Sequence, residues 1–306
     1  MNVDLLTGDT PRTDAAVSVL RSKAELRAAL EPSRRQGLQI GLVPTMGFLH
    51  EGHLSLLRAA RVECDLVVIS LFVNPTQFGP GEDLDRYPRD EQRDLALAAE
   101  AGADLVYAPE AAEVYPENFS TQVEVTGQLT GVLDGDPARR GPEHFRGVTT
   151  IVAKLFNLVA PDVAYFGQKD AQQAAVIRRM VRDLDFPLRV EVLPTVREAD
   201  GLAMSSRNAY LDPADRERAV AISRALAAVE QEALAGSLAA GLEAGARILA
   251  EAGIEPEYLE ARDAESLAPV EDLGERPVLV AVAAPLGAAR LIDNILIDPE
   301  RAERER

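Results

Sequence analysis

The sequence predicts an α/β protein in which a doubly wound parallel sheet is followed by a smaller α+β domain. As far as residue 194, apolar runs alternate with segments of helical periodicity, as in consecutive strand–helix–strand units. The run over 65–73, DLVVISLFV, is apolar nearly throughout, which is typical of a parallel strand covered on both faces. Beyond residue 194 this alternation stops. We therefore expect a first domain over 1–194 and a smaller one over 195–306.

The alternation assigns the elements of the first domain in turn. The expected helices cover 15–35, 53–63, 89–101, 148–159 and 171–184. The expected strands cover 38–43, 65–73, 103–109, 162–167 and 188–194, and together they form one parallel sheet. Each strand–helix–strand crossover should be right-handed. The glycine-rich stretch 127–147 is expected to be a structured surface loop.

The second domain begins with a polar, irregular segment. Two alanine-rich helices are expected over 213–235 and 238–252. Strands are expected over 256–263, 277–287 and 290–298, the last two forming a hairpin around Gly287. The charged tail after residue 298 is expected to fray.

The composition disfavours two classes of partner. Acidic residues outnumber lysine and arginine by 50 to 32, a formal charge of -18, and such a surface repels nucleic acid and anionic membranes. An anionic substrate would therefore need positive charge gathered locally. The single cysteine, Cys64, permits no internal disulfide and fits a reducing cytoplasm. No signal peptide is recognised, and no apolar run reaches the roughly 20 residues that span a bilayer.

The stretch PTMGFLHEGH follows the first expected strand and leads into a helix. Ligands of open α/β sheets bind outside the carboxyl ends of strands, and a helix N-terminus there favours phosphate. Gly47 and Gly52 let the backbone approach a ligand closely, and His50 and His53 can donate hydrogen bonds to it. The G-x-G-x-x-G and G-x-x-x-x-G-K-[ST] patterns of other nucleotide sites are absent.

Two other interpretations of the paired histidines remain open. They could form half of a zinc site, but zinc needs three or four protein ligands. The remaining soft candidates are only His144 and Cys64. Alternatively, both imidazoles serve the fold alone.

Two further strand ends carry polar side chains. FVNPTQF supplies Asn74 and Gln77, whose amides suit a hydroxyl or carboxylate, although Asn-Pro is also a common turn. YFGQKDAQQ supplies Lys169, one of only three lysines, which could equally be a solvated side chain. Asp170 is expected to cap the next helix, and Gln173 to face the same side one turn later.

The stretch GLAMSSRN lies where the two domains meet. Ser205, Ser206 and Arg207 can surround phosphate oxygens, although a serine-rich linker turn would look alike. Because the strand ends of a doubly wound sheet converge on one crevice, we expect these segments to share one site.

Taken in order, PTMGFLHEGH, FVNPTQF, HFRGV, FGQKDAQQ, PTVREADGLAMSSRN and DNI resemble the motifs of the pantothenate synthetase (pantoate–β-alanine ligase) family. The His-x-Gly-His element also resembles that of wider nucleotidyltransferases and class I aminoacyl-tRNA synthetases. The resemblance implies a Rossmann-like nucleotidyltransferase domain and condensation of pantoate with β-alanine, using ATP and Mg²⁺. Pantoyl adenylate would be the intermediate, and pantothenate, AMP and pyrophosphate the products. It also implies a cytoplasmic homodimer with small-molecule substrates.

The resemblance also assigns residues. ATP binding falls to Met46, Gly47, Phe48, Leu49, His50, Glu51, Gly52, His53, Gly167, Gln168, Lys169, Asp170, Val196, Met204, Ser205, Ser206 and Arg207. Pantoate and β-alanine binding falls to Gln77, Gln173 and Asn74, and catalysis to His53, His50, Lys169, Ser205, Ser206 and Arg207. Asp94 is expected to be associated with Mg²⁺, and Tyr87 and His144 to support the site. His53 matches the family's proton donor, but we expect it to stabilise charge on the α-phosphate. Gln168 stands where many relatives have glutamate.

Three other functions are weighed against this one. A nucleotidyltransferase that stops at a nucleotide-linked product would not need Gln77 and Gln173 to hold a carboxylate. An aminoacyl-tRNA synthetase is disfavoured by the chain's size and acidic balance. A nucleotide-sensing or structural zinc module is the non-enzymatic alternative.

Overall fold

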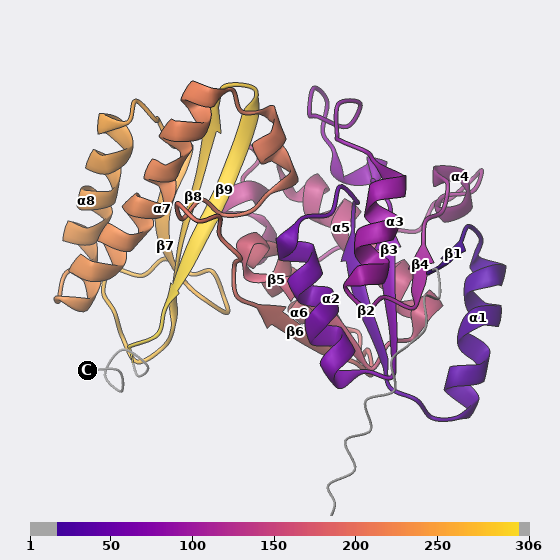
Figure 1. The fold of residues 1–306 in the computed structure, drawn as a ribbon. Helices are drawn as coiled ribbons and strands as arrows, with labels where there is room; N and C mark the ends of the chain where they lie inside the picture. Colours follow the sequence, from indigo (N-terminus) through magenta and orange to yellow (C-terminus); the bar gives the residue numbers. More distant parts are fainter. Residues whose placement is uncertain (1–16, 300–306) are drawn as a thin grey trace, which may run out of the picture.

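The computed structural model describes residues 17–299, which form two bodies side by side (Figure 1). Within this range, the larger body contains a six-stranded parallel sheet in the order β1-β4-β3-β2-β5-β6. Its strands are β1 (Ser18–Leu20), β2 (Ile40–Thr45), β3 (Leu66–Leu71), β4 (Leu105–Tyr107), β5 (Val163–Gly167) and β6 (Arg189–Leu193). The sheet continues from β2 through β3 on one side and from β5 through β6 on the other, so the topological switch lies between β2 and β5.

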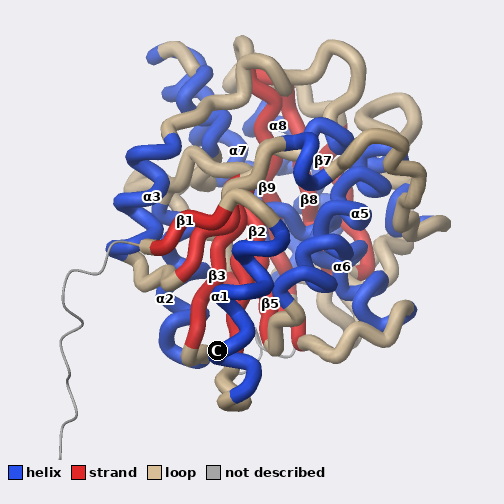
Figure 2. The backbone as a smooth tube through the Cα atoms, turned by 90° about the vertical axis from the view of Figure 1, so that its right-hand side faces the viewer, coloured by secondary structure: helices blue, strands red, loops and turns tan. Residues whose placement is uncertain are grey.

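Helices cover both faces of this sheet (Figure 2). They are α1 (Lys23–Arg35), α2 (Glu51–Glu63), α3 (Glu91–Glu100), α4 (Ala111–Val114), α5 (Pro142–Val159) and α6 (Ala171–Asp183). One apolar cluster joins α1, α5 and α6 to the sheet, and a second cluster joins α2 and α3 to the opposite face. The predicted doubly wound α/β fold is therefore confirmed.

The N-terminal helix expected over 15–35 is wrong at its start. Residues Ser18–Leu20 form edge strand β1, which pairs in parallel with β4. The helix begins only after Ser22, whose side chain accepts from the Glu25 backbone N–H while the Glu25 carboxylate accepts from the Ser22 backbone N–H. This capping box stops the helix from extending backwards. Residues 15 and 16 lie outside the described range, as does the charged tail from residue 300.

The loop expected over 127–147 is shorter than predicted. Short 3₁₀ turns, η2 (Gln128–Thr130) and η3 (Leu133–Gly135), occupy its first part, and α5 already begins at Pro142. A glycine inside the helix explains part of the error. A Cβ on Gly147 would collide with the Thr76 carbonyl oxygen, so only glycine allows the turn after β3 to pack this closely.

The smaller body matches the predicted α+β arrangement. It comprises α7 (Pro213–Leu234), α8 (Leu238–Glu251), β7 (Tyr258–Asp263), β8 (Val278–Leu286) and β9 (Ala289–Ile297). Within residues 17–299, these three strands form one antiparallel sheet, β7-β8-β9, with the expected hairpin at Gly287. Both helices pack on one face, and a further apolar cluster joins the sheet to α5, α6 and the 127–147 segment. No helix of the described range is long and apolar enough to cross a membrane.

Candidate active site

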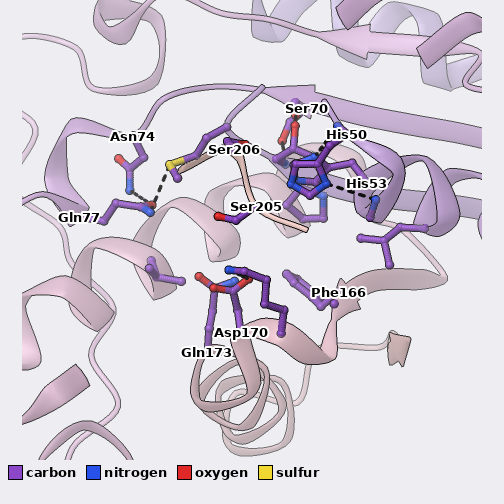
Figure 3. Close-up of a pocket in the computed structure, with 18 of the residues that line it drawn as sticks. His50, His53, Ser70, Asn74, Gln77, Phe166, Asp170, Gln173, Ser205 and Ser206 are labelled. Atoms are coloured by element: carbon purple, nitrogen blue, oxygen red, sulfur yellow. Dashed lines mark hydrogen bonds and ion pairs between the residues drawn. The ribbon is translucent and has the colours of Figure 1, made fainter. Parts of the chain in front are cut away.

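A cavity lies at the carboxyl end of the parallel sheet, at the switch between β2 and β5. The segments that follow β2, β3, β5 and β6 line it, together with the chain that enters the smaller body. Of the residues singled out from the sequence, the lining includes Met46, His50, Gly52, His53, Asn74, Gln77, Tyr87, His144, Gly167, Lys169, Asp170, Gln173, Val196, Met204, Ser205, Ser206 and Arg207. In Figure 3 the histidines lie at one side of the cavity and Asn74 with Gln77 at the other.

The chain after β2 is shaped by one buried carboxylate. Gly47 adopts φ +84, a left-handed turn that favours glycine. The Asp94 carboxylate then accepts the backbone N–H groups of Phe48 at 2.6 Å and Leu49 at 2.7 Å. Burial raises the pKa of Asp94, and these two hydrogen bonds oppose that rise. Because both oxygens bind backbone and Asp94 does not line the cavity, its geometry indicates support of the loop rather than contact with Mg²⁺.

The two imidazoles stand at the N-terminus of α2. The Gly52 N–H donates to His50 Nδ1 at 3.2 Å, and the His50 N–H donates to His53 Nδ1 at 3.4 Å. The ring centroids are 4.1 Å apart. With Nδ1 accepting in each ring, the neutral imidazoles carry their proton on Nε2 and can donate it to a ligand.

Burial, assisted by nearby positive charge, keeps both rings neutral. Burial, followed by the positive charge of Lys169, lowers the pKa of His50 to about 4. Burial also holds the pKa of His53 well below its ordinary value, with His50 and Lys169 adding to the effect. Residues 17–299 contain no group of three or more histidine, cysteine, aspartate or glutamate side chains that could hold a metal ion. A zinc site at the pair would thus lack its further protein ligands in that range.

Lys169 enters the cavity from the turn after β5. This turn, η4 (Gln168–Asp170), leads directly into α6. The Lys169 Nζ lies 3.9 Å from the Asp170 carboxylate, and its side chain is 17% exposed. Asp170 stands at the N-cap position of α6 but its side chain makes no capping hydrogen bond, so the predicted capping role is wrong. Instead its carboxylate is about half exposed, beside the cavity.

The segment 204–207 closes the same end. The Ser206 hydroxyl donates to the Phe48 carbonyl oxygen at 3.2 Å, which ties this segment to the loop after β2. The Arg207 guanidinium donates to both oxygens of Asp83, at 2.9 and 3.0 Å. Burial alone would lower the pKa of Arg207, but its pairing with Asp83 raises it. We call His50, His53, Lys169 and Arg207 the imidazole end of the cavity.

The opposite end, which we call the amide end, comprises Asn74, Gln77, Arg140 and His144. Asn74 is 1% exposed and donates to Gln77 Oε1 and to the Gly147 carbonyl oxygen, both at 3.1 Å. Arg140 Nη1 lies 3.0 Å from His144 Nε2. A guanidinium only donates, so Nε2 accepts and Nδ1–H donates to the Gln77 carbonyl oxygen at 2.8 Å. Burial, then the charge of Arg140, lowers the pKa of His144 to about 4.

Comparison with known proteins shows which family has this sequence. A family model described as pantoate-beta-alanine ligase matches residues 18–296, nearly all of the described chain. This chain belongs to the pantoate–β-alanine ligase family. Its sequence is 53% identical over 285 residues to the pantothenate synthetase of Moorella thermoacetica, covering 92% of this chain and 99% of that one. It is 52% identical over 282 residues to pantothenate synthetase 1 of Bradyrhizobium diazoefficiens, covering 92% and 98%.

Solved structures of the family have the same fold. The pantothenate synthetase of Thermus thermophilus superposes with a TM-score of 0.85 at 50% identity, covering 91% of this chain and 99% of that chain. A Francisella tularensis pantoate–β-alanine ligase, complexed with beta-gamma ATP and β-alanine, gives a TM-score of 0.77 at 31% identity, covering 92% and 98%.

Several residues assigned by resemblance to this ligase family lie behind the cavity surface. Gly47, Phe48, Leu49, Glu51 and Gln168 are absent from its lining. Leu49 is 0% exposed in the core, and Glu51 forms an ion pair with Arg58 on the exposed face of α2. Gln168 donates to Asn294 of the smaller body. These five residues therefore do not line the cavity.

Sequence reasoning missed two features of the ligase site. Arg140 lies in the stretch that was expected to be a loop, where an arginine is ordinarily solvated. An apolar wall was also missed; it is formed by Phe72, Val148, Ile151, Val152, Leu155 and Phe166. The i, i+3, i+4, i+7 spacing on α5 was a usable signal, but such a stripe ordinarily indicates core packing.

Proposed function

We propose that this chain condenses pantoate with β-alanine, using ATP, to give pantothenate, AMP and pyrophosphate through a pantoyl adenylate. One observation carries the proposal: a single cavity joins a set of phosphate-binding groups to an amide-lined pocket with an apolar wall. The first suits a triphosphate and the second suits a small branched hydroxy acid. Membership of the ligase family supports the same reaction.

The imidazole end fits the triphosphate. The N-terminus of α2 offers a positive dipole end, and the Nε2–H groups of His50 and His53 add neutral donors. Lys169 and Arg207 supply charge. The adenine would lie against Val196, whose carbonyl oxygen already accepts from the Met204 N–H at 3.0 Å. That bond holds the backbone of Val196 in place beside the cavity.

The amide end fits pantoate, which has two hydroxyls, a carboxylate and a geminal dimethyl group. Gln77, on one wall, and Gln173, which projects from α6, offer amides to the polar groups (Figure 3). The apolar wall, which includes Val152 and Phe166, suits the dimethyl group. Asn74 holds Gln77 by the bond to its Oε1. The pantoate carboxylate would thus point at the α-phosphate.

Two displacements complete the reaction. A pantoate carboxylate oxygen bonds to the α-phosphorus as the bond from phosphorus to the departing pyrophosphate breaks. The amine of β-alanine then bonds to the acyl carbon, loses a proton, and AMP leaves. Positioning and charge stabilisation dominate such chemistry. Since His50 and His53 are neutral, they stabilise charge on the α-phosphate as hydrogen-bond donors rather than as acids.

Mg²⁺ ordinarily binds nucleotides through one or two carboxylates plus phosphate oxygens and water. Asp170 lines the cavity next to Lys169 with a half-exposed carboxylate, so it fits this role better than Asp94. When bound, the ion would neutralise phosphate charge. Homodimeric assembly, a cytoplasmic location and a domain boundary after residue 194 remain predictions.

The decisive experiment follows the order of product release. The purified protein is incubated with ATP, Mg²⁺ and pantoate, and exchange of labelled pyrophosphate into ATP is measured. We expect pantoate-dependent exchange without β-alanine, and release of AMP with pantothenate once β-alanine is added. Exchange that never leads to AMP would instead indicate a nucleotidyltransferase that stops at a nucleotide-linked product. Absence of both activities would refute the proposal.

A further inference from the structure

Strand β9 of the smaller body carries two buried polar residues to the imidazole end of the cavity. Asp293 and Asn294 are 3% and 4% exposed. Neither belongs to the set assigned above to ATP or pantoate. Their side chains nevertheless hold two segments that line the cavity.

All the side-chain hydrogen bonds found for Asn294 go to the turn that carries Lys169. Its Nδ2 donates to the carbonyl oxygens of Gln168, at 2.9 Å, and Lys169, at 2.8 Å. Its Oδ1 accepts from Gln168 Nε2 at 3.0 Å. A glutamate at position 168 could not make that last donation, so Gln168 adds a third hydrogen bond that holds the Asn294 amide in this chain.

Asp293 holds the second segment. Its oxygens accept from the two terminal nitrogens of Arg197 at 2.7 and 3.1 Å, and one of them also accepts from the Asn294 N–H at 2.8 Å. Arg197 follows Val196, which lines the cavity. The same point on β9 is therefore anchored to both sides of the proposed nucleotide site.

We propose that Asn294 is a positioning residue for Lys169, so that the smaller body sets where the ammonium group stands relative to the triphosphate. This inference rests on the proposed function. A lysine side chain is a flexible stem with a point charge. Within residues 17–299, the ion pair found for Lys169 is the 3.9 Å contact with Asp170. Its place therefore depends on the backbone of η4, which Asn294 holds by two hydrogen bonds.

The test begins with Asn294→Asp, which keeps the shape and the acceptor but cannot donate to the two carbonyl oxygens. We expect the affinity for a non-hydrolysable ATP analogue, measured by calorimetry, to fall about tenfold, because small misplacements of binding groups are costly. The KM for pantoate should stay within about twofold. Asn294→Leu removes the amide without adding charge and should act in the same direction.

A control variant on the same strand tests whether general destabilisation of the smaller body could explain a loss of affinity. Ile297 is 1% exposed and lies outside the cavity lining, so Ile297→Ala should lower the melting temperature while leaving ATP-analogue affinity within about twofold. An equal loss of affinity in Ile297→Ala would overturn the positioning role, since general loosening of the smaller body would then suffice.

A double-mutant cycle asks whether Asn294 acts through Lys169. In the Lys169→Ala background, Asn294→Asp should lower the affinity for the ATP analogue by less than about a further twofold, because the ammonium group that Asn294 positions is absent. The same factor in both backgrounds would overturn the proposal while the ligase function stands. If the unaltered protein shows no pantoate-dependent pyrophosphate exchange, the proposed function itself fails, and with it any role of Asn294 in that reaction.

Discussion

The two ends of the cavity hold their polar groups differently. At the imidazole end, His50, His53 and Lys169 project from the start of α2 and the turn after β5, with Nε2–H and ammonium groups directed to the cavity. At the amide end, Asn74 and Gln77 are bonded to each other, and His144 is bonded to Gln77. The first end is built to donate hydrogen bonds to a ligand, whereas the second is largely satisfied within the protein.

This difference predicts how substitutions divide between catalysis and stability. Removing an open donor leaves at most one backbone N–H without its acceptor, as with the 3.4 Å bond from the His50 N–H to His53 Nδ1, so the fold should lose little stability while the reaction suffers. Removing a member of a closed network leaves its partners unsatisfied, which costs stability as well. The following predictions test that division, beginning with the largest effect.

His53→Ala should lose adenylate formation by about 10²–10³-fold, as expected for removal of one donor to developing charge, while the melting temperature falls only slightly because the His50 N–H loses its acceptor. Pantoate-dependent pyrophosphate exchange is the measurement. Removal of both His50 and His53 should cost more.

Arg58→Ala is the matched control, because Arg58 lies on the same helix with its side chain 54% exposed and is paired only with Glu51 in the described contacts. Arg58→Ala should catalyse pantoate-dependent pyrophosphate exchange at an unchanged rate. Retention of most activity in His53→Ala would remove the imidazole pair from the mechanism.

Lys169→Ala should raise the KM for ATP by about 10- to 100-fold, since a charged hydrogen bond to phosphate is typically worth about 1.5–3 kcal/mol. The KM for pantoate should change little. Lys23→Ala, which removes a lysine paired with Glu113 away from the cavity, serves as control. ATP kinetics unaltered in Lys169→Ala would show that the triphosphate lies elsewhere.

The sequence predicted the imidazole end well because its groups follow from local rules. Strand ends and helix starts can be placed from periodicity, and they carry His53 and Lys169 to the switch between β2 and β5. The strand at Ser18–Leu20 was missed because the apolar spacing around it also suits a helix, and only its pairing with β4 decides the matter.

The contacts that complete the site join residues far apart in the chain. Arg140 reaches Gln77, and Asn294 reaches Gln168. No periodicity encodes such pairings, since the first depends on how distant elements of the larger body pack and the second on how the two bodies pack. Asp94 shows the same limit: the family pattern associates it with Mg²⁺, but no pattern in the sequence predicts that its carboxylate accepts the backbone N–H groups of Phe48 and Leu49.

His144 at the amide end should contribute to the pH dependence of stability. Its pKa is lowered to about 4 in the folded protein, against about 6.5 when unfolded. Between these values the unfolded chain binds a proton that the folded chain does not, so the free energy of unfolding falls as pH falls. This cost is absent above pH 7 and reaches about 2 kcal/mol by pH 5.

The measurement is urea unfolding of the unaltered protein and His144→Asn at pH 7.5 and pH 5. The variant should be less stable at pH 7.5, because the network is disturbed, and the difference should shrink at pH 5. Carboxylates titrate in both proteins, so only the difference is informative. A difference that does not change with pH would show that His144 titrates normally in the fold.

The smallest effect concerns Asp83, which makes Arg207 the exception at the imidazole end. Both side-chain hydrogen bonds found for the Arg207 guanidinium go to this carboxylate. To bind Arg207, a phosphate of ATP must therefore displace Asp83. Because ATP replaces one anionic partner of Arg207 by another, its binding gains only the difference between the two, for which we take about 1 kcal/mol, the upper end for exposed ion pairs. Asp83→Asn should therefore lower the KM for ATP by about two- to fivefold, whereas Asp85→Asn, the same charge change two residues away on an exposed side chain, should not. A higher KM in Asp83→Asn would mean that Asp83 positions Arg207 for the phosphate rather than competing with it, and the imidazole end would then share the closed design of the amide end.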